Sequence, residues 1–353
     1  MKKLLVLLAA VAFVVAFTVP AMSADKAEWS FYGNARMATF YDDVEPEGGE
    51  GDTDLQWDLQ GNSRIGAAVK AGDIGGGFEY GTGINLRKIY GTWNFGGGSL
   101  LVGQTYTPLD YFSSGQVKDG DTGLIGYGTS YTGRLPQIKL NIAGLELALI
   151  KPNTLAVTKA STAWDDCASC TAAPGTVFDD TDTSLPKLEV AYKINLGSAH
   201  IKILGGFQTY DLVVGGKELS LDSLVYGFGV TAPFGPAYFK GSLLAGKNAG
   251  NLGIAGAGTA TASATEIVDN DTLAYTAVLG FKASDMISFE LGYGHIENED
   301  DVSGAPKTEA DAYYAQAVIN IAKGFFVVPE VGKFDKKDTK ETTYYGAKWQ
   351  INF

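Results

Sequence analysis

The chain has 353 residues, of which 45% are apolar and 19% are charged, and its 40 acidic residues outnumber its 27 basic ones. The near-zero mean hydropathy excludes a polytopic helical membrane protein, and the acidic balance excludes a basic surface for nucleic acid. With 46 Gly, 12% aromatic residues, four Met and two His, the composition argues against a helical bundle, a disordered chain, and haem or multi-His metal chemistry.

The first residues have the pattern of an export signal. Lys2 and Lys3 precede an apolar run from residue 4 to 17, and small residues around Ser23 and Ala24 would suit a signal peptidase. The run is too short to span a bilayer, which takes about 20 residues. We therefore predict a signal peptide over residues 1–24, whose removal takes away two Lys and no acid and leaves 25 basic and 40 acidic residues.

The rest of the chain, residues 25–353, alternates between apolar and polar side chains. The alternation is clear at residues 29–41, 55–71, 187–195 and 272–282, and again in the last residues of the chain. A period of two is typical of half-buried β-strands, so the whole segment is predicted to be all-β.

The connections between the alternating segments come in two kinds, and they too alternate. Seven are short turns, at residues 72–75, 96–99, 143–144, 196–198, 234–236, 283–285 and 322–324. Eight others, most of them longer and polar, fall near residues 43–54, 82–86, 105–134, 152–185, 212–220, 248–270, 298–308 and 335–341. Fifteen connections predict sixteen strands, and strands of about 10 residues are long enough to cross a bilayer when tilted.

A soluble β-sandwich would also alternate, but it would bury its apolar faces within a shorter chain. Sixteen strands with a persistent polar face fit a closed, antiparallel, up-and-down transmembrane β-barrel better, because closure in lipid leaves no unpaired strand edge. Short turns would then lie in the periplasm and long loops outside the cell. The predicted location is the outer membrane of a Gram-negative bacterium.

Five segments resemble the general Gram-negative porins. Residues 31–36 (FYGNAR) and 61–66 (GNSRIG) are similar to the first two strands of that family, and 98–104 (GSLLVGQ) with 107–110 (TPLD) to the approach to its third loop. The terminal 349–353 (WQINF) looks like the aromatic signal read by the outer-membrane barrel-assembly machinery, so the resemblance gives Phe353 that role.

The resemblance implies a homotrimer with one water-filled pore per subunit and passive diffusion of ions and small hydrophilic solutes. It also implies a third loop, at residues 105–134, that folds into the lumen. No nucleic acid and no cofactor are expected as partners.

Charged residues are placed unevenly along the chain. Its four Arg all lie in the first 134 residues; Arg36 and Arg64 have lumen parity with Lys88, Arg134 closes the third loop, and Arg87 has outward parity. If the third loop folds inward, its carboxylates face these cations across a narrow gap and leave weak net ion selectivity. The predicted constriction has a basic wall and an acidic loop. The basic residues are Arg36, Arg64, Lys88 and Arg134, and the acidic ones are Asp110, Asp119 and Asp121.

Two smaller features remain. Acidic outer loops could collect divalent cations such as calcium that also bridge lipopolysaccharide, but a solvated surface with no ordered ion is the preferred explanation. Cys167 and Cys170 in the long fourth loop are a candidate disulfide in an oxidising compartment, with free thiols, a redox pair or half of a zinc site as alternatives.

Other functions stay open at this point. A substrate-specific channel, selective for anions or sugars, would show saturable conductance. A plugged structural barrel would show none. An outer-membrane hydrolase would need a His beside a nucleophile, and neither His200 next to a short turn nor His295 at an outer strand end is so placed, so no enzyme is predicted.

Overall fold

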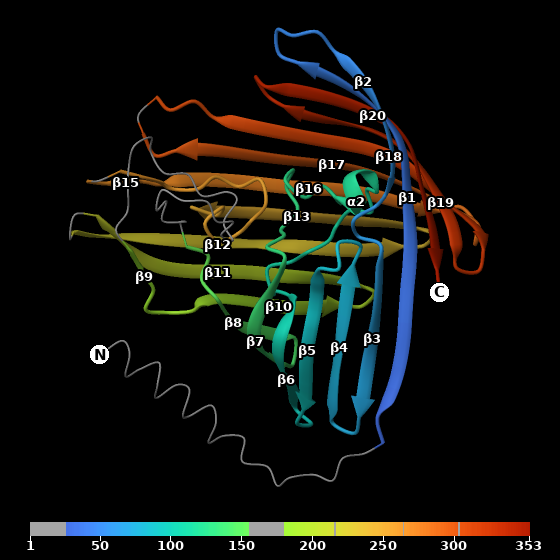
Figure 1. Cartoon of the computed structure of the whole chain (residues 1–353), viewed down its shortest axis with the longest axis horizontal. Helices are drawn as coiled ribbons and strands as arrows, with labels where there is room; N and C mark the ends of the chain where they lie inside the picture. Colours follow the sequence, from blue (N-terminus) through green and yellow to red (C-terminus); the bar gives the residue numbers. More distant parts are fainter. Residues whose placement is uncertain (1–25, 155–179, 215–216, 264, 303) are drawn as a thin grey trace.

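The computed structural model describes residues 26–154, 180–214, 217–263, 265–302 and 304–353. The predicted signal peptide (1–24), Cys167 and Cys170 lie outside these residues. One helix and twenty strands follow one another along the described chain (Figure 1). The elements are β1 (Glu28–Pro46), β2 (Asp52–Leu59), β3 (Arg64–Ala71), β4 (Ile74–Gly81), β5 (Leu86–Asn94), β6 (Gly98–Tyr106), α2 (Lys118–Asp121), β7 (Arg134–Ile142), β8 (Leu145–Ile150), β9 (Asp180–Asp182), β10 (Lys187–Leu196), β11 (Ala199–Val214), β12 (Lys217–Phe234), β13 (Ala237–Lys247), β14 (Thr261–Ala262), β15 (Ile267–Val268), β16 (Asn270–Lys282), β17 (Ile287–Asp300), β18 (Thr308–Ala322), β19 (Phe325–Lys336) and β20 (Lys340–Asn352).

Eighteen of these strands form a single antiparallel sheet that closes on itself where β1 pairs with β20. Two pairs of short strands continue each other: β2 and β3 both pair with β1, and β9 and β10 both pair with β11. The wall is therefore a closed barrel of sixteen strands, as the sequence predicts. The small β14–β15 hairpin stands apart from it.

The alternation at residues 55–71 predicts a strand, and the structure confirms it except at residues 60–63, which separate β2 from β3. Residues 60–63 leave the ladder, so that four residues stand opposite Ala35 and Arg36 on β1. The backbone N–H of Arg36 donates to Ser63 Oγ at 2.9 Å, which holds the bulge against β1. Alternation of side chains does not reveal such an insertion, because it resumes on the other side.

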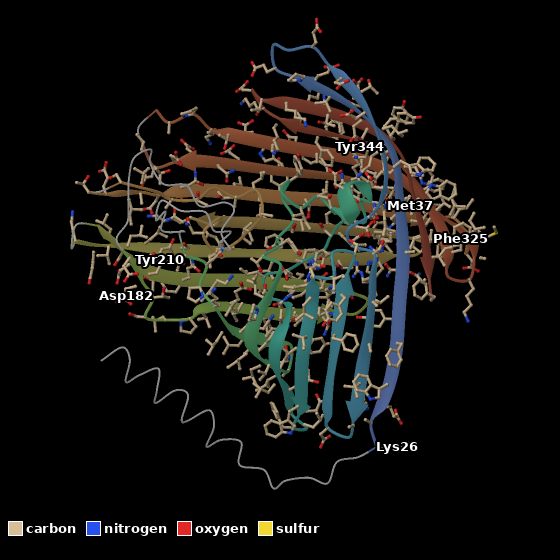
Figure 2. All side chains as sticks on the ribbon, in the orientation of Figure 1. Lys26, Met37, Asp182, Tyr210, Phe325 and Tyr344 are labelled. Carbon is tan, nitrogen blue, oxygen red and sulfur yellow. The ribbon has the colours of Figure 1, made fainter. Side chains whose placement is uncertain are left out.

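The two faces of the barrel wall differ in the polarity and exposure of their side chains. Large apolar side chains such as Phe31 (77% exposed), Trp57 and Ile65 lie on the outer face, which a soluble protein would not leave bare. Buried apolar side chains lie inside, where strands β10–β20 meet the inward-folded loops. Figure 2 shows this division, with Met37 on the outer face and Tyr344 on the inner one.

Within the described ranges, helices are too short and too polar for any of them to cross a membrane.

The seam of the barrel generates a prediction about assembly. Phe353 and Gly33 exchange two backbone hydrogen bonds of 2.8 and 3.0 Å where the first and last strands meet. Deleting Phe353 removes this last pair and the terminal ring, so less protein should reach the outer membrane. Immunoblotting of outer-membrane and periplasmic fractions measures the change. Phe353→Tyr keeps the backbone pair and an aromatic ring at the C-terminus, so it serves as the control. Normal outer-membrane levels of the chain without Phe353 would contradict a role of this residue in assembly.

Candidate functional site

One long connection, residues 107–133 between β6 and β7, lies against the inner face of the wall; we call it L3. Near its start, Leu109 lies against Gly206 of β11 and Tyr111 against Gly229 of β12. A Cβ at Gly229 would lie 2.4 Å from the Tyr111 ring, so this approach requires glycine. L3 thus touches strands far from its own ends.

Two wall carboxylates hold the middle of L3 by its backbone. Glu290 on β17 accepts a hydrogen bond from the Gly115 N–H at 2.7 Å, and Glu330 on β19 accepts from the N–H groups of Val117 and Lys118 at 2.8 and 3.0 Å. Hydrogen bonds to a carboxylate are stronger than those between neutral groups. They draw L3 against strands β17–β20, away from the inner face of β3–β8.

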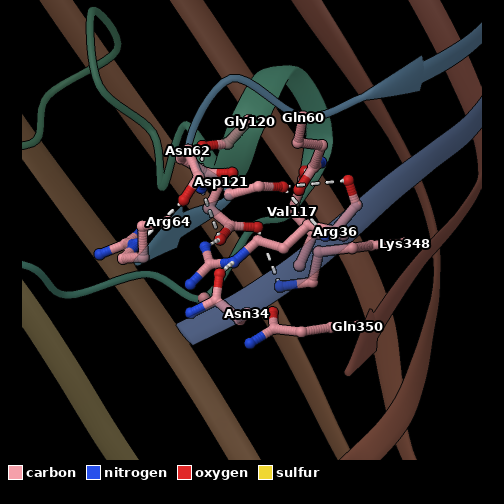
Figure 3. Close-up of polar contacts among 12 residues, drawn as sticks. Asn34, Arg36, Gln60, Asn62, Arg64, Val117, Gly120, Asp121, Lys348 and Gln350 are labelled. Atoms are coloured by element: carbon pink, nitrogen blue, oxygen red, sulfur yellow. Dashed lines mark hydrogen bonds and ion pairs between the residues drawn. The ribbon is translucent and has the colours of Figure 1, made fainter. Parts of the chain in front are cut away.

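The α2 turn docks the middle of L3 on β1 and β20 (Figure 3). Asp121 forms an ion pair with Arg36, is 2.9 Å from Lys348 Nζ, and accepts a hydrogen bond from the Asn62 amide at 2.8 Å. Asp121 has φ +60°, which is uncommon for a residue other than glycine. Arg36 and Asp121 are therefore in contact rather than opposed across a gap.

Lys118 and Asp119 belong to the same turn. The Lys118 side chain is 2% exposed, and its Nζ lies 2.8 Å from both Asp42 Oδ2 and Gln56 Oε1. Asp119 lies 3.2 Å from the same ammonium, with its own side chain 55% exposed. Lys118 thus neutralises part of the negative charge predicted for the constriction.

Asp110 lies apart from the other two predicted acids, at the root of L3. Its carboxylate accepts hydrogen bonds from the backbone N–H groups of Thr107 and Thr132, at 2.9 and 2.7 Å, and is 6% exposed. It ties the two limbs of L3 together and forms no ion pair with Arg36, Arg64, Lys88 or Arg134, all of which the structure describes. Burial raises the pKa of Asp110 to about 7, and these backbone hydrogen bonds limit the rise.

A second group of charges lies on β3–β5 around one carboxylate. Glu79 Oε1 is 3.5 Å from Arg64 and 2.8 Å from Arg87, and Oε2 is 3.7 Å from Lys88 and accepts from the Tyr32 hydroxyl at 3.1 Å. The outward orientation predicted for Arg87 is wrong: a β-bulge in the β4–β5 pairing places two consecutive residues opposite Glu79. Three cations therefore share one acid.

The basic row continues onto β7 and β11. Lys139 and Lys202 lie 3.9 and 3.7 Å from Glu146, and each ammonium also donates to a carbonyl at the root of L3. The Arg134 guanidinium lies 5.3 Å from the centre of the Tyr106 ring and donates to its hydroxyl at 3.1 Å. Among the described residues, the eight cations of the row have three carboxylates within ion-pair distance, so they exceed these carboxylates by five. The cations are Arg36, Arg64, Arg87, Lys88, Arg134, Lys139, Lys202 and Lys348, and the acids are Glu79, Glu146 and Asp121.

A further loop, residues 248–269, was predicted to be an outer loop, but its first half packs inside the barrel on L3. The Ala255 N–H donates to the Tyr131 carbonyl at 3.2 Å, and the Leu252 carbonyl accepts from Lys187 Nζ at 2.9 Å. Leu252 is fully buried. The sequence does contain a signal for this, because residues 248–260 (NAGNLGIAGAGTA) have no charge, unlike an exposed loop.

The sequence matches a known protein family over nearly its whole length. Residues 9–339 match the family described as Gram-negative porin. The chain belongs to this family. It forms a channel for small solutes in the outer membrane, and the bilayer surrounds its sixteen strands.

Solved structures share the porin's fold. The outer-membrane channel DcaP of Acinetobacter baumannii has a TM-score of 0.68 at 18% identity, covering 93% of this chain and 97% of its own. The outer-membrane protein OmpT of Vibrio cholerae (0.56, 14%, covering 94% and 100%) and the anion-selective porin from Comamonas acidovorans (0.55, 13%, covering 92% and 100%) are also similar. No curated protein matches the sequence.

No group of three or more His, Cys, Asp or Glu side chains suited to a metal ion occurs in the part of the porin that the structure describes.

The root of L3 generates a prediction about pH. The pKa of Asp110 lies above the ordinary 3.8, so docked L3 binds the proton more tightly than released L3. Docking is therefore most favourable at low pH and loses stability as the pH rises through about 7. The charged carboxylate would face Glu189, Lys139 and Tyr131. Single-channel records should flicker more at about pH 8.5 than at about pH 5.

The Asp110→Asn porin supplies the control, because it cannot take up this charge. It should flicker alike at both pH values. If the pH dependence persists in this variant, Asp110 is not its origin.

The inward half of the 248–269 loop generates a second prediction. Replacing residues 250–257 by two glycines should widen the porin's outer vestibule and raise its single-channel conductance, because fully buried Leu252 and its neighbours occupy lumen volume. A matched deletion of residues 304–306 in the β17–β18 connection should change conductance little. Equal conductance of the wild type and the 250–257 variant would show that the restriction lies elsewhere.

Proposed function

We propose that solutes pass between L3 and the basic row on β1, β3–β8, β11 and β20, and that this passage prefers anions. The observation that carries the proposal is that the described cations of that row exceed the carboxylates within ion-pair distance by five. Each carboxylate there is shared by two or three cations, as Glu79 is by Arg64, Arg87 and Lys88. Fixed cations that exceed their counter-charges raise the local concentration of anions.

The proposal revises the weak selectivity expected from the sequence. That expectation opposed three free Asp to the basic wall. Asp110 instead bonds to the L3 backbone, Asp119 lies beside Lys118, and Asp121 contacts both Arg36 and Lys348. Little acidic charge then remains to balance the row. The overall acidity of the chain comes from residues outside it, such as those in 43–54.

Family membership and sequence patterns support further proposals for this porin. We infer that the porin is a homotrimer and that residues 1–24 are a signal peptide. We also infer that the outer-membrane barrel-assembly machinery recognises Phe353 and that the outer loops contact lipopolysaccharide. We also infer that the porin works without catalysis and without a cofactor. From the sequence we also propose a Cys167–Cys170 disulfide in an oxidising compartment. For the acidic outer loops we propose a solvated surface, with bound calcium as the alternative.

Ion selectivity tests the proposed passage. The zero-current potential of the reconstituted channel in a KCl gradient should show preference for chloride. Arg64→Gln with Lys88→Gln should lower the chloride-to-potassium permeability ratio about two- to five-fold, since a charge ~4 Å away is worth ~1 kcal/mol in water. The effect should shrink at 1 M salt, where the Debye length is ~3 Å.

Two further variants make the selectivity test specific. Glu79→Gln should move the ratio in the opposite direction, toward chloride. Lys282→Gln changes a cation that is 62% exposed at a periplasmic turn and paired with Asp285, so it should change nothing. A wild-type channel that prefers potassium would refute the proposal.

A further inference from the structure

The lumen contains an exposed aromatic side chain that the passage of simple ions does not explain. Phe112 of L3 is 46% exposed, although it belongs to a loop whose other side chains are largely buried. Its neighbours explain its direction: Tyr111 bonds to Thr231 of β12 at 2.9 Å, and Ser113 bonds to Thr276 of β16 at 2.7 Å. With both neighbours held on the wall, Phe112 projects away from it.

Two tyrosines surround Phe112. The ring centre of Tyr106 lies 5.2 Å from that of Phe112, at 74°, and the ring centre of Tyr131 lies 5.7 Å away, at 53°. Tyr106 and Tyr131 are 6.5 Å apart. The three rings form a small apolar surface, which we call the aromatic platform (Tyr106, Phe112 and Tyr131). Edge contacts of this kind fix the rings and leave part of the Phe112 surface free.

Cations flank the aromatic platform on the side of the basic row. Lys88 Nζ lies 5.0 Å and Arg134 Cζ 5.3 Å from the centre of the Tyr106 ring. Lys88 also lies 3.7 Å from Glu79, whereas Arg134 donates to the Tyr106 hydroxyl. An apolar surface with a few convergent charged groups is the usual composition of a small-ligand site.

We propose that the aromatic platform, together with Lys88 and Arg134, binds small carboxylates that have a flat ring. The ring would stack on Phe112, and the carboxylate would face the ammonium and the guanidinium, which suits planar anions. A ring without a carboxylate would lack the ion pairs with Lys88 and Arg134. A carboxylate without a ring would lack the stacking on Phe112. This site rests on the proposed passage, because L3 and the basic row border both.

The test uses the full mature protein in planar bilayers, with sodium benzoate as the probe. Benzoate should block the KCl current at a concentration at least ten-fold below that of acetate, which has the charge without the ring, or of benzyl alcohol, which has the ring without the charge. Phe112→Ala should raise the half-blocking concentration of benzoate about five-fold, as expected for loss of one aromatic contact. Block is expressed relative to each variant's own KCl current.

Matched variants separate stacking from bulk and from charge. Phe112→Tyr keeps the ring and should keep the block, whereas Arg134→Gln should weaken block by benzoate and leave block by benzyl alcohol unaltered. Tyr127→Leu removes a ring of L3 that stacks on Phe334 outside the aromatic platform. Benzoate should block this variant at the same concentration as the wild type.

Three outcomes would overturn the site. They are equal block by benzoate and acetate, equal block of wild type and Phe112→Ala, and loss of benzoate block in Tyr127→Leu. Each of them, seen in a channel that still prefers chloride, leaves the proposed passage intact. A wild-type channel without chloride preference would instead refute the proposed passage, and equal block in that channel would refute both.

Discussion

The arrangement of the lumen depends on two carboxylates that accept backbone hydrogen bonds. Glu290 and Glu330 project inward from β17 and β19 and bind N–H groups of L3 that no strand could satisfy. An unpaired buried amide is costly, so these acceptors fix which side of the barrel L3 follows. Tyr314 and Tyr344 also donate to them, at 2.6 and 3.1 Å, which holds the acceptors in place.

One consequence is a lumen with two unlike halves. Along β10–β20 the inner face is apolar where it meets L3 and the 248–269 loop, as at Val225, Leu244 and Val278, which are almost fully buried. Along β3–β8 the inner face instead has Arg and Lys side chains in shared ion pairs, with a few buried apolar side chains such as Leu101, Ala148 and Ile150 among them. Inner-face side chains need to be polar only where they contact water. Where L3 and the 248–269 loop cover the wall and exclude water, apolar side chains can line it.

Local pattern explains what could be predicted from the sequence. Sixteen strands follow from alternation and turn spacing, because the period of two and the turn residues are properties of neighbouring residues. Alternation does not predict the break at residues 60–63 or the inward position of Arg87. Each results from extra residues inserted where two strands pair, and such insertions leave no local pattern in the sequence. Glu290 and Glu330 could be assigned to the lumen by parity, but not to L3, whose path is set by contacts more than 170 residues away in sequence.

The same reasoning explains why Asp110 and Asp121 differ in role although both are acids of one loop. Asp110 stands where the two limbs of L3 approach each other, so unpaired backbone N–H groups of Thr107 and Thr132 are its nearest donors. Asp121 stands where L3 meets the wall, so Arg36 and Lys348 are its nearest cations. A carboxylate accepts hydrogen bonds from the donors that lie near it in the folded chain. The sequence shows that each residue is acidic, but not which donors surround it. The charge that governs permeation is therefore the remainder left after such local pairings, and on β3–β8 that remainder is positive.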